Sequence, residues 1–324
     1  RNMNVKKINN VVVVNRYLDF VDGSVEWQDV GNYYAPVVSM FSINDNLYRV
    51  VFSSGDAGGF ARILKIFPDP DLSFTSNVII GPEGSGDNAY IYANPYSKTA
   101  FIKGSIPYTG GEFTIKGALF NPPLSFAKYL TDYLRNNGIS VLGYNVVSDE
   151  ALTENSKIVG VFYSPSLSEI LKVMNKKSFN FYGESLLRYS LIKEGIIGRD
   201  ENLIEIANFL KGNSINRFRI VDGSGLSRKN FFSSSGFVKL LINAANKNYF
   251  EAFYDSLAGM EEKSFQIKGA SEFRVKTGSM SYVRSYCGYL KKGKKTYVFS
   301  FIFNNYLENP ENLKKSVEDY LSDL

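Results

Sequence analysis

The chain has 324 residues, with 37 Lys and Arg against 32 Asp and Glu, no His and a single Cys. Without His, the sequence excludes a Ser-His-Asp triad, a Cys-His pair and a zinc site with His ligands. With Cys287 alone, it also excludes an internal disulfide, a CxxC redox pair and a Cys-rich metal site. If the chain is an enzyme, its catalytic bases must be Lys, Asp, Glu or Tyr.

Composition indicates a folded protein with more than one domain. The hydrophobic and charged fractions, 44% and 21%, are ordinary for a globular chain, and a length near 300 residues usually divides into two or three domains. The net charge of +5 is spread along the chain. The basic run at 291–295 lies between two alternating apolar runs and predicts a hairpin turn, so we expect no nucleic-acid partner. The sequence contains no run of 18 apolar residues, so it predicts no transmembrane segment.

The first 120 residues predict a β-module. Short apolar or alternating runs bounded by Gly, Pro, Asn or Asp occur at residues 11–14, 46–52, 89–93, 100–104 and 112–117. Strands of this length and spacing are typical of a small sandwich or barrel. A helix with Leu124, Ala127, Leu130 and Leu134 on one face follows and ends at Asn137-Gly138.

Two segments on either side of this module resemble each other. Residues 4–13 and 138–147 are both typical of a segment that leaves a helix and enters a strand. We expect them to be two strands of one sheet, with the β-module inserted between them. The opening copy has no helix before it in this sequence, so we also expect the parent protein to have a segment upstream.

The second half predicts helices, then an antiparallel meander, then a last helix. Ser164 and Pro165 are expected to open the first helix, and further helices are expected at 181–191, 201–210 and 236–245. Strands are expected at 273–280, 282–290 and 295–303. Asn309-Pro310 opens a closing helix, whose inward residues are predicted to be Leu313, Val317, Tyr320 and Leu321. This order predicts an α+β fold with helices packed on an antiparallel sheet.

A Lys276-Thr277-Gly278 triplet, followed by Ser279, lies on the first strand of that meander. The Lys supplies a positive charge and a donor, and the Thr hydroxyl can hold a substrate carboxylate. Gly leaves room for a substrate backbone beside the strand, and the next N–H can donate to an oxyanion. Alone, the triplet is weak evidence for a site, and the more ordinary interpretation is a strand that turns at Gly278.

A Ser178-Phe179-Asn180 segment separates two predicted helices. Its hydroxyl could relay a proton and its amide could hold a substrate carbonyl. The same Ser-x-Asn pattern also occurs at 42–44 and 214–216, and either polar residue could simply cap the next helix. The loop at 222–227, Asp-Gly-Ser-Gly-Leu-Ser, reads as a tight strand-to-helix connection and lacks the spacing of a phosphate-binding motif.

Taken together, these segments resemble one enzyme family. The runs at 174–187, 222–228 and 273–280, with Gly288-Tyr289 and residues 299–304, are similar to the D-alanyl-D-alanine carboxypeptidases of the penicillin-binding protein 4 type, peptidase family S13. The front half is also similar to the inserted domains of that family, at Trp27, Asp29, Tyr33-Tyr34, 42–46, Gly58-Gly59 and Pro68. The likeness covers nearly the whole chain, in the order of the family.

The resemblance implies a domain organisation. Residues 1–30 and 119–157 would form an inserted α/β domain in two segments, and residues 31–118 a β-domain nested within it. Residues 158–324 would be the C-terminal part of a penicillin-binding catalytic domain, in which helices pack on an antiparallel sheet.

The resemblance also implies a function: acyl-enzyme hydrolysis of the D-Ala-D-Ala end of peptidoglycan peptides, and binding of β-lactams. Ser178, Asn180 and Lys276 would be catalytic, and Thr277, Gly278 and Ser279 would bind substrate. No metal or organic cofactor is implied, and the compartment would be the periplasm or the outer cell surface.

The family's Ser-x-x-Lys nucleophile is expected upstream of Arg1. Two matches within the chain, Ser125 with Lys128 and Ser190 with Lys193, come in the wrong order. Three interpretations are therefore open: a peptidase portion downstream of its nucleophile, a non-catalytic relative that binds peptidoglycan, or an unrelated α+β protein with accidental matches. The oligomeric state is not predicted.

Overall fold

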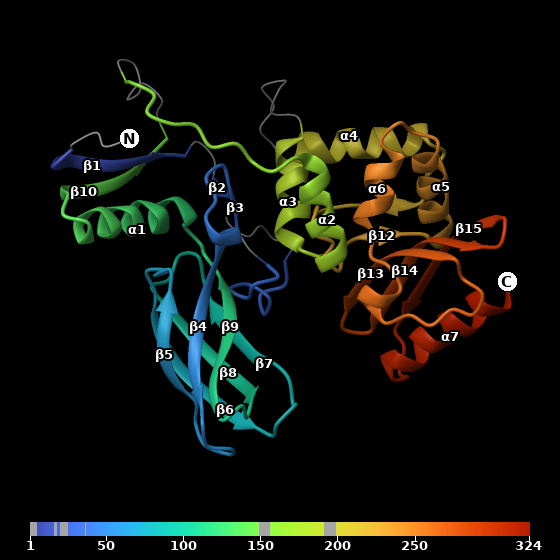
Figure 1. Cartoon of the computed structure of the whole chain (residues 1–324), viewed down its shortest axis with the longest axis horizontal. Coiled ribbons are helices and arrows are strands. Elements are labelled where there is room, and N and C mark those ends of the chain that lie inside the picture. The colour runs from blue at the N-terminus through green and yellow to red at the C-terminus, as the bar shows by residue number, and fades with distance from the viewer. Residues whose placement is uncertain (1–4, 16–17, 20–24, 36, 149–155, 191–198) are drawn as a thin grey trace. The chain divides into compact units, whose positions relative to one another are not determined.

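The computed structural model describes residues 5–15, 18–19, 25–35, 37–148, 156–190 and 199–324 (Figure 1). The chain divides into two compact units, residues 1–161 and 162–324. Each unit has its own hydrophobic clusters, so each is described by itself. Among the described helices, none combines the length and the hydropathy that a membrane-spanning helix requires.

The first unit contains a β-sandwich made of two three-stranded sheets. In one sheet, β4 (Leu47–Ser54) pairs antiparallel with β5 (Arg62–Phe67) and with β9 (Gly111–Ala118). In the other, β8 (Thr99–Pro107) pairs parallel with β6 (Ser73–Gly81) and antiparallel with β7 (Asn88–Ala93). The alternate residues of these strands share one core, which includes Val50, Phe52, Val78, Ile91 and Ile102. The predicted β-module is confirmed, although β5 and β6 were not predicted.

The two similar segments that flank the sandwich pair with each other. Strand β1 (Lys7–Val14) runs parallel to β10 (Ser140–Val147) from Lys7 opposite Ser140 to Val14 opposite Val147. Helix α1 (Pro122–Asn136) packs against this pair through Ala127. The short strands β2 (Leu18–Asp19) and β3 (Val38–Ser39) also pair in this unit, and η1 (Asn44–Asn46) is a single 3₁₀ turn. The predicted pairing across the insertion is confirmed.

The second unit is built on an antiparallel meander of β13 (Glu272–Met280), β14 (Val283–Lys292) and β15 (Lys295–Asn304). On one face, Phe273, Val275 and Phe299 pack with Val317 and Leu321 of α7 (Pro310–Asp323). On the other face, Tyr289 packs with residues of α5 (Ser234–Ala245) and α6 (Phe250–Ser256). Helices therefore cover both faces of this antiparallel sheet. The helix α6 was not predicted.

Three more helices precede the meander: α2 (Leu167–Lys177), α3 (Asn180–Tyr189) and α4 (Arg199–Gly212). The pair β11 (Phe218–Arg219) and β12 (Phe231–Phe232) follows them, and η4 (Glu261–Lys263) is a 3₁₀ turn before β13. Helix α2 packs against α6 and α3, and α3 packs against α4.

Two local predictions about helices were wrong. Helix α2 is capped by Ser166, not Ser164, because the Ser166 hydroxyl accepts the Glu169 N–H while the Glu169 carboxylate accepts the Ser166 N–H. In α7, Leu313, Val317 and Leu321 are buried, but Tyr320 is 59% exposed. A residue one step before Leu321 lies about 100° around the helix, outside the buried stripe.

Candidate active site

Ser178 is held at the end of helix α2 in a left-handed conformation. Its φ and ψ are 52° and 50°, and the N–H groups of both Ser178 and Phe179 donate to the Met174 carbonyl. This closing turn satisfies the last carbonyls of the helix and projects the exposed Ser178 hydroxyl away from it.

The end of α2 is fixed to the rest of the unit just before Ser178. The buried Asn175 amide donates to the Ser256 hydroxyl at 2.7 Å, and Lys176 donates to the Glu262 carboxylate at 3.0 Å. Glu262 in turn accepts the Gly259 N–H at 2.7 Å. Two of these contacts tie α2 to the end of α6 and to the segment before β13, and the Gly259–Glu262 bond holds that segment, which positions Ser178 relative to the sheet of the same unit.

Lys276 of β13 reaches the Ser178 hydroxyl. Its Nζ donates to Ser178 Oγ at 2.6 Å and to the Thr277 carbonyl at 2.5 Å. The first bond joins residues 98 positions apart in the sequence. Two of the three predicted catalytic residues therefore lie in direct contact.

The environment of Lys276 disfavours its charge. Burial, followed by repulsion from the Lys263 ammonium, lowers the pKa of Lys276 to about 8. Cys287 lies directly opposite in the sheet, and burial raises the pKa of its thiol to about 11, so this neighbour stays neutral at pH 7. A lysine in this setting can exchange a proton near neutral pH, which an ordinary lysine cannot.

Strand β13 is an edge strand of its sheet along the predicted binding residues. Val275 exchanges two backbone hydrogen bonds with Ala258, of 2.8 and 3.1 Å, on the side away from β14. Because backbone groups alternate along a strand, the N–H and C=O groups of Thr277 and Ser279 lie on that same outer side. This geometry suits pairing with an extended peptide.

Gly278 is a residue of the strand and not a turn. Strand β13 continues to Met280, and a Cβ at Gly278 would lie 2.5 Å from the Ser285 hydroxyl. A side chain at this position would force the Ser285 hydroxyl to rotate away, and it would also crowd any peptide that approaches this edge.

Asn180, the third predicted catalytic residue, is the first residue of helix α3 and is partly exposed. It follows Ser178 by two positions, so the same turn carries both side chains. Between them, the Phe179 ring lies 5.0 Å from the Tyr182 ring in an edge-to-face arrangement. The aromatic pair anchors the middle residue of the turn to α3.

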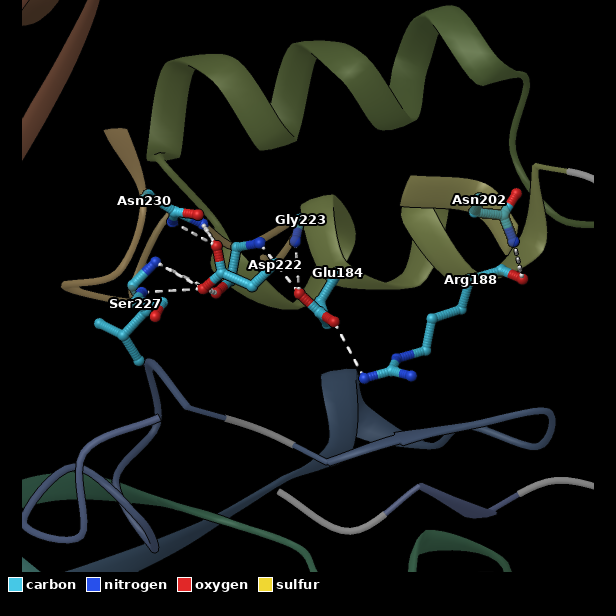
Figure 2. A network of polar contacts seen from close by, with 10 residues as sticks. Glu184, Arg188, Asn202, Asp222, Gly223, Ser227 and Asn230 are labelled. Atoms are coloured by element: carbon cyan, nitrogen blue, oxygen red, sulfur yellow. Dashed lines mark hydrogen bonds and ion pairs between the residues drawn. The ribbon is translucent and has the colours of Figure 1, made fainter. Parts of the chain in front are cut away.

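A second polar network organises the loop at 222–227 (Figure 2). The buried Asp222 carboxylate accepts the N–H groups of Gly225, Leu226 and Ser227 at 2.8–3.1 Å. It also accepts the Ser224 hydroxyl and the Asn230 amide, at 2.9 and 2.6 Å. One side chain thus replaces the hydrogen bonds that a regular element would give this loop.

Helix α3 holds the other side of the same loop. Glu184 accepts the N–H groups of Gly223 and Ser224 at 2.7 and 3.0 Å and pairs with Arg188 at 3.0 Å (Figure 2). The Glu184 and Arg188 side chains are only 12% and 6% exposed. Burial raises the pKa of Glu184, and Arg188 opposes that shift. This buried pair was not predicted, although Glu and Arg four positions apart on a helix were a possible signal.

Two further cations near the predicted site were also missed. Lys263 acts on Lys276 through space, and Arg284 lies directly opposite Ser279 on β14. Opposite residues of an antiparallel pair share one face, so the Arg284 and Ser279 side chains are neighbours. The Arg284 guanidinium donates to the Tyr306 hydroxyl at 3.3 Å. Neither residue belongs to a short motif, so only the fold relates them to the site.

The Ser-x-x-Lys match on α1 has a different chemistry. Ser125 is buried, and the Lys128 ammonium is hydrogen bonded to Asp69. That bond raises the pKa of Lys128, which keeps the amine protonated and unsuited to accept a proton from a serine. In the other match, the Ser190 hydroxyl donates to Asn202, and Lys193 lies outside the described residues.

Metal ligands were not expected, and the described residues include no cluster of three or more His, Cys, Asp or Glu that could hold an ion.

Comparison with known proteins identifies the family. The sequence profile of the D-Ala-D-Ala carboxypeptidase 3 (S13) family matches residues 4–322. The chain belongs to this family. The predicted resemblance is confirmed, and the motif matches are not accidental.

Two relatives and one solved structure illustrate the likeness. The penicillin-sensitive carboxypeptidase A of Dictyostelium discoideum is 24% identical over 336 residues, covering 94% of this chain and 64% of that protein. The D-alanyl-D-alanine carboxypeptidase of Actinomadura sp. (strain R39) is 26% identical over 247 residues, covering 71% of this chain and 46% of that protein. The chain thus spans less than two thirds of the length of either relative.

One structural neighbour is penicillin-binding protein 4 (dacB) of Haemophilus influenzae. It matches with a TM-score of 0.75 at 18% identity, over 98% of this chain and 76% of that one. A complex of the same protein with a β-lactam matches with a TM-score of 0.67. These likenesses establish the penicillin-binding-protein fold, which confirms the predicted α+β class.

Proposed function

We propose that this chain forms the substrate-binding and proton-transfer part of a serine-type D-Ala-D-Ala peptidase. Ser178, Asn180 and Lys276 would be its catalytic residues, and Thr277, Gly278 and Ser279 would bind the substrate. The observation that carries the proposal is the 2.6 Å hydrogen bond from Lys276 Nζ to Ser178 Oγ, between motifs that are distant in the sequence. Membership of the S13 family supports the reaction type.

The substrate would be a peptidoglycan stem peptide that lies along the free edge of β13. Its backbone would pair with Thr277 and Ser279, and its terminal carboxylate would meet the hydroxyl groups of these two residues. The Lys276 ammonium adds positive charge at the same place, which favours an anionic peptide end or the carboxylate of a β-lactam.

The reaction would proceed through an acyl-enzyme. The serine of the family's Ser-x-x-Lys motif attacks the carbonyl of the penultimate D-Ala, and the paired lysine takes the serine proton. Ser178 passes a proton to the nitrogen of the terminal D-Ala as the C–N bond breaks, with Lys276 donating to Ser178 Oγ. The Asn180 amide would hold the peptide, and water would then hydrolyse the ester. D-Ala cross-links would be cleaved by the same steps.

A non-catalytic peptidoglycan-binding role is the second candidate. One observation favours it. The Ser-x-x-Lys match at Ser125 and Lys128 belongs to the first unit, and its lysine is paired with Asp69, so this match is unsuited to be the nucleophile. Both candidate roles place the working protein outside the cytoplasm, where peptidoglycan lies, and both include binding of β-lactams.

Labelling of the full-length gene product with a fluorescent penicillin tests the proposal. The peptidase role predicts a covalent label that resists denaturation. The Lys276→Met variant should label at least about 100-fold more slowly, whereas Lys268→Met, an exposed lysine of the same unit, should label normally.

Two results would contradict parts of this account. A protein that binds a D-Ala-D-Ala peptide but never becomes labelled is a binding relative and not a peptidase. Normal labelling of Lys276→Met would show that the assigned site is wrong.

A further inference from the structure

The first unit contains a cavity that the proposed function does not use. It has a volume of about 160 Å³ and lies where the β5–β6 and β7–β8 turns meet the start of α1 and the strand β10. An engineered protein cavity of about 150 Å³ accommodates benzene. The cavity is therefore of a size to hold a single six-membered ring, and it is far too small for a drug-sized ligand.

Apolar and aromatic side chains contribute to the lining of the cavity. Phe120, Leu72 and Leu124 contribute the apolar side chains, and Phe120 is buried in the core of the sandwich. Tyr96 and Tyr144 also line it, and they are 83% and 39% exposed. The negative face of an aromatic ring attracts C–H groups that carry partial positive charge. An exposed tyrosine beside a ring-sized hollow is thus a suitable surface for the C–H face of a pyranose.

Polar groups of both kinds surround the opening. Lys98 pairs with Asp71 and Lys128 pairs with Asp69, and all four residues line the cavity. The paired charges cancel, so the site has no net preference for an anion or a cation. Each hydroxyl of a sugar both donates and accepts, and adjacent ammonium and carboxylate groups can satisfy both roles at once.

These ion pairs leave their groups accessible. The Lys98 and Asp71 side chains are more than half exposed, and exposed ion pairs contribute little to stability. A ligand can therefore share or replace these contacts without unfolding the turns that carry them. Asn121, Ser97 and Ser125 add uncharged polar groups to the same lining.

We propose that this cavity is a carbohydrate subsite that holds one neutral pyranose ring. The sugar would stack on Tyr96 and form hydrogen bonds with the Asp69, Asp71, Lys98 and Lys128 side chains. The cavity lies wholly within the first unit, so the inference stands independently of the peptidase site in the second unit.

Calorimetric titration of the full chain with N-acetylglucosamine tetramer tests this site. The unaltered chain should bind saturably, and Tyr96→Ala should weaken binding by about tenfold, the scale of one lost aromatic contact. Tyr90→Ala, which removes a 47% exposed tyrosine from β7 of the same unit, should bind like the unaltered chain. Asp71→Asn should weaken binding about threefold.

Controls separate a lost contact from lost structure. Tyr96 follows β7 on an exposed turn, so its variant should melt at the same temperature as the unaltered chain. The inference is overturned if the tetramer does not bind at millimolar concentration, or if Tyr90→Ala weakens binding as much as Tyr96→Ala. It is also overturned if the zwitterion 2,6-diaminopimelate binds in place of the sugar. Penicillin labelling tests the second unit and sugar titration tests the first, so either the peptidase proposal or the sugar-site proposal can be refuted without the other.

Discussion

Two serine–lysine pairs in this chain differ both in their spacing along the sequence and in their chemistry. Ser125 and Lys128 in the first unit have the spacing of a Ser-x-x-Lys nucleophile, yet Lys128 is paired with Asp69, and its pKa is raised. Ser178 and Lys276 in the second unit are 98 residues apart, yet they are hydrogen bonded, and the pKa of Lys276 is lowered to about 8.

The comparison shows that the partner and the burial of a lysine decide its role, and that its spacing from a serine does not. A carboxylate stabilises the ammonium form of Lys128 and removes its basicity. Burial and a second cation destabilise the ammonium form of Lys276, and these same factors bring its proton exchange near neutral pH.

Removal of the Ser178 hydroxyl is expected to have the largest effect and tests the contrast between the two serine–lysine pairs most severely. Ser178→Ala should slow acylation of the full-length protein by penicillin about 100- to 1000-fold, because the hydroxyl that relays the proton is lost. The rate is measured by stopped-flow or time-resolved labelling. Ser214→Ala is a matched control, because Ser214 also begins a Ser-x-Asn pattern and has a φ of 57°. Equal rates in the two variants would refute the role of Ser178.

The carboxylates of the two units should differ in their contributions to stability. Asp222→Ala leaves three N–H groups, one of them buried and two partly buried, without their acceptor, so it should lower the free energy of unfolding of the second unit by about 3 kcal/mol. Asp69→Ala removes an exposed ion pair from the first unit and should cost about 0.5 kcal/mol or less. Urea unfolding followed by circular dichroism measures both, and similar losses would contradict the assigned burial.

The pH dependence of ligand binding should follow Lys276. Its pKa is depressed, so the ammonium is present below about pH 8 and is lost as the pH rises through that value. Binding of a penicillin carboxylate should therefore weaken above pH 8. Lys263→Met removes the repelling cation, raises the pKa of Lys276 and moves the loss of binding to higher pH. An unchanged profile, or a shift to lower pH, would show that Lys263 does not act on Lys276.

The smallest effect is expected at Lys128. Asp69→Asn removes the carboxylate that favours the ammonium, so the pKa of Lys128 should fall towards the ordinary lysine value. The change is measured by nuclear magnetic resonance titration of the lysine side chains.

Much of the fold follows from local patterns. The pairing of β1 with β10 could be predicted because two similar segments each lead into a Val-rich strand. The meander could be predicted because apolar and polar residues alternate on both sides of a turn at Gly293. Strands β5 and β6 were missed because charged and polar residues interrupt their apolar positions. Helix α6 was missed because its seven residues are too short for a clear period.

The residues of the candidate site also include some that could be predicted from the sequence and some that could not. Ser178 and Lys276 could be predicted because each lies in a motif that a family resemblance connects. Lys263, Arg284 and the Glu184–Arg188 pair could not, because their importance comes from burial and from neighbours distant in the sequence. Charge state is likewise a property of the folded environment, so the contrast between Lys128 and Lys276 is invisible in the sequence.

A direct titration of the lysine side chains tests the central claim. The chain is labelled with ¹³C at lysine Cε, and the Lys276 and Lys128 signals are identified by their loss in Lys276→Met and Lys128→Met. The account predicts that Lys276 titrates near pH 8 and that Lys128 titrates above the ordinary lysine value. If both lysines titrate together at the ordinary value, the distinction between the two sites is wrong.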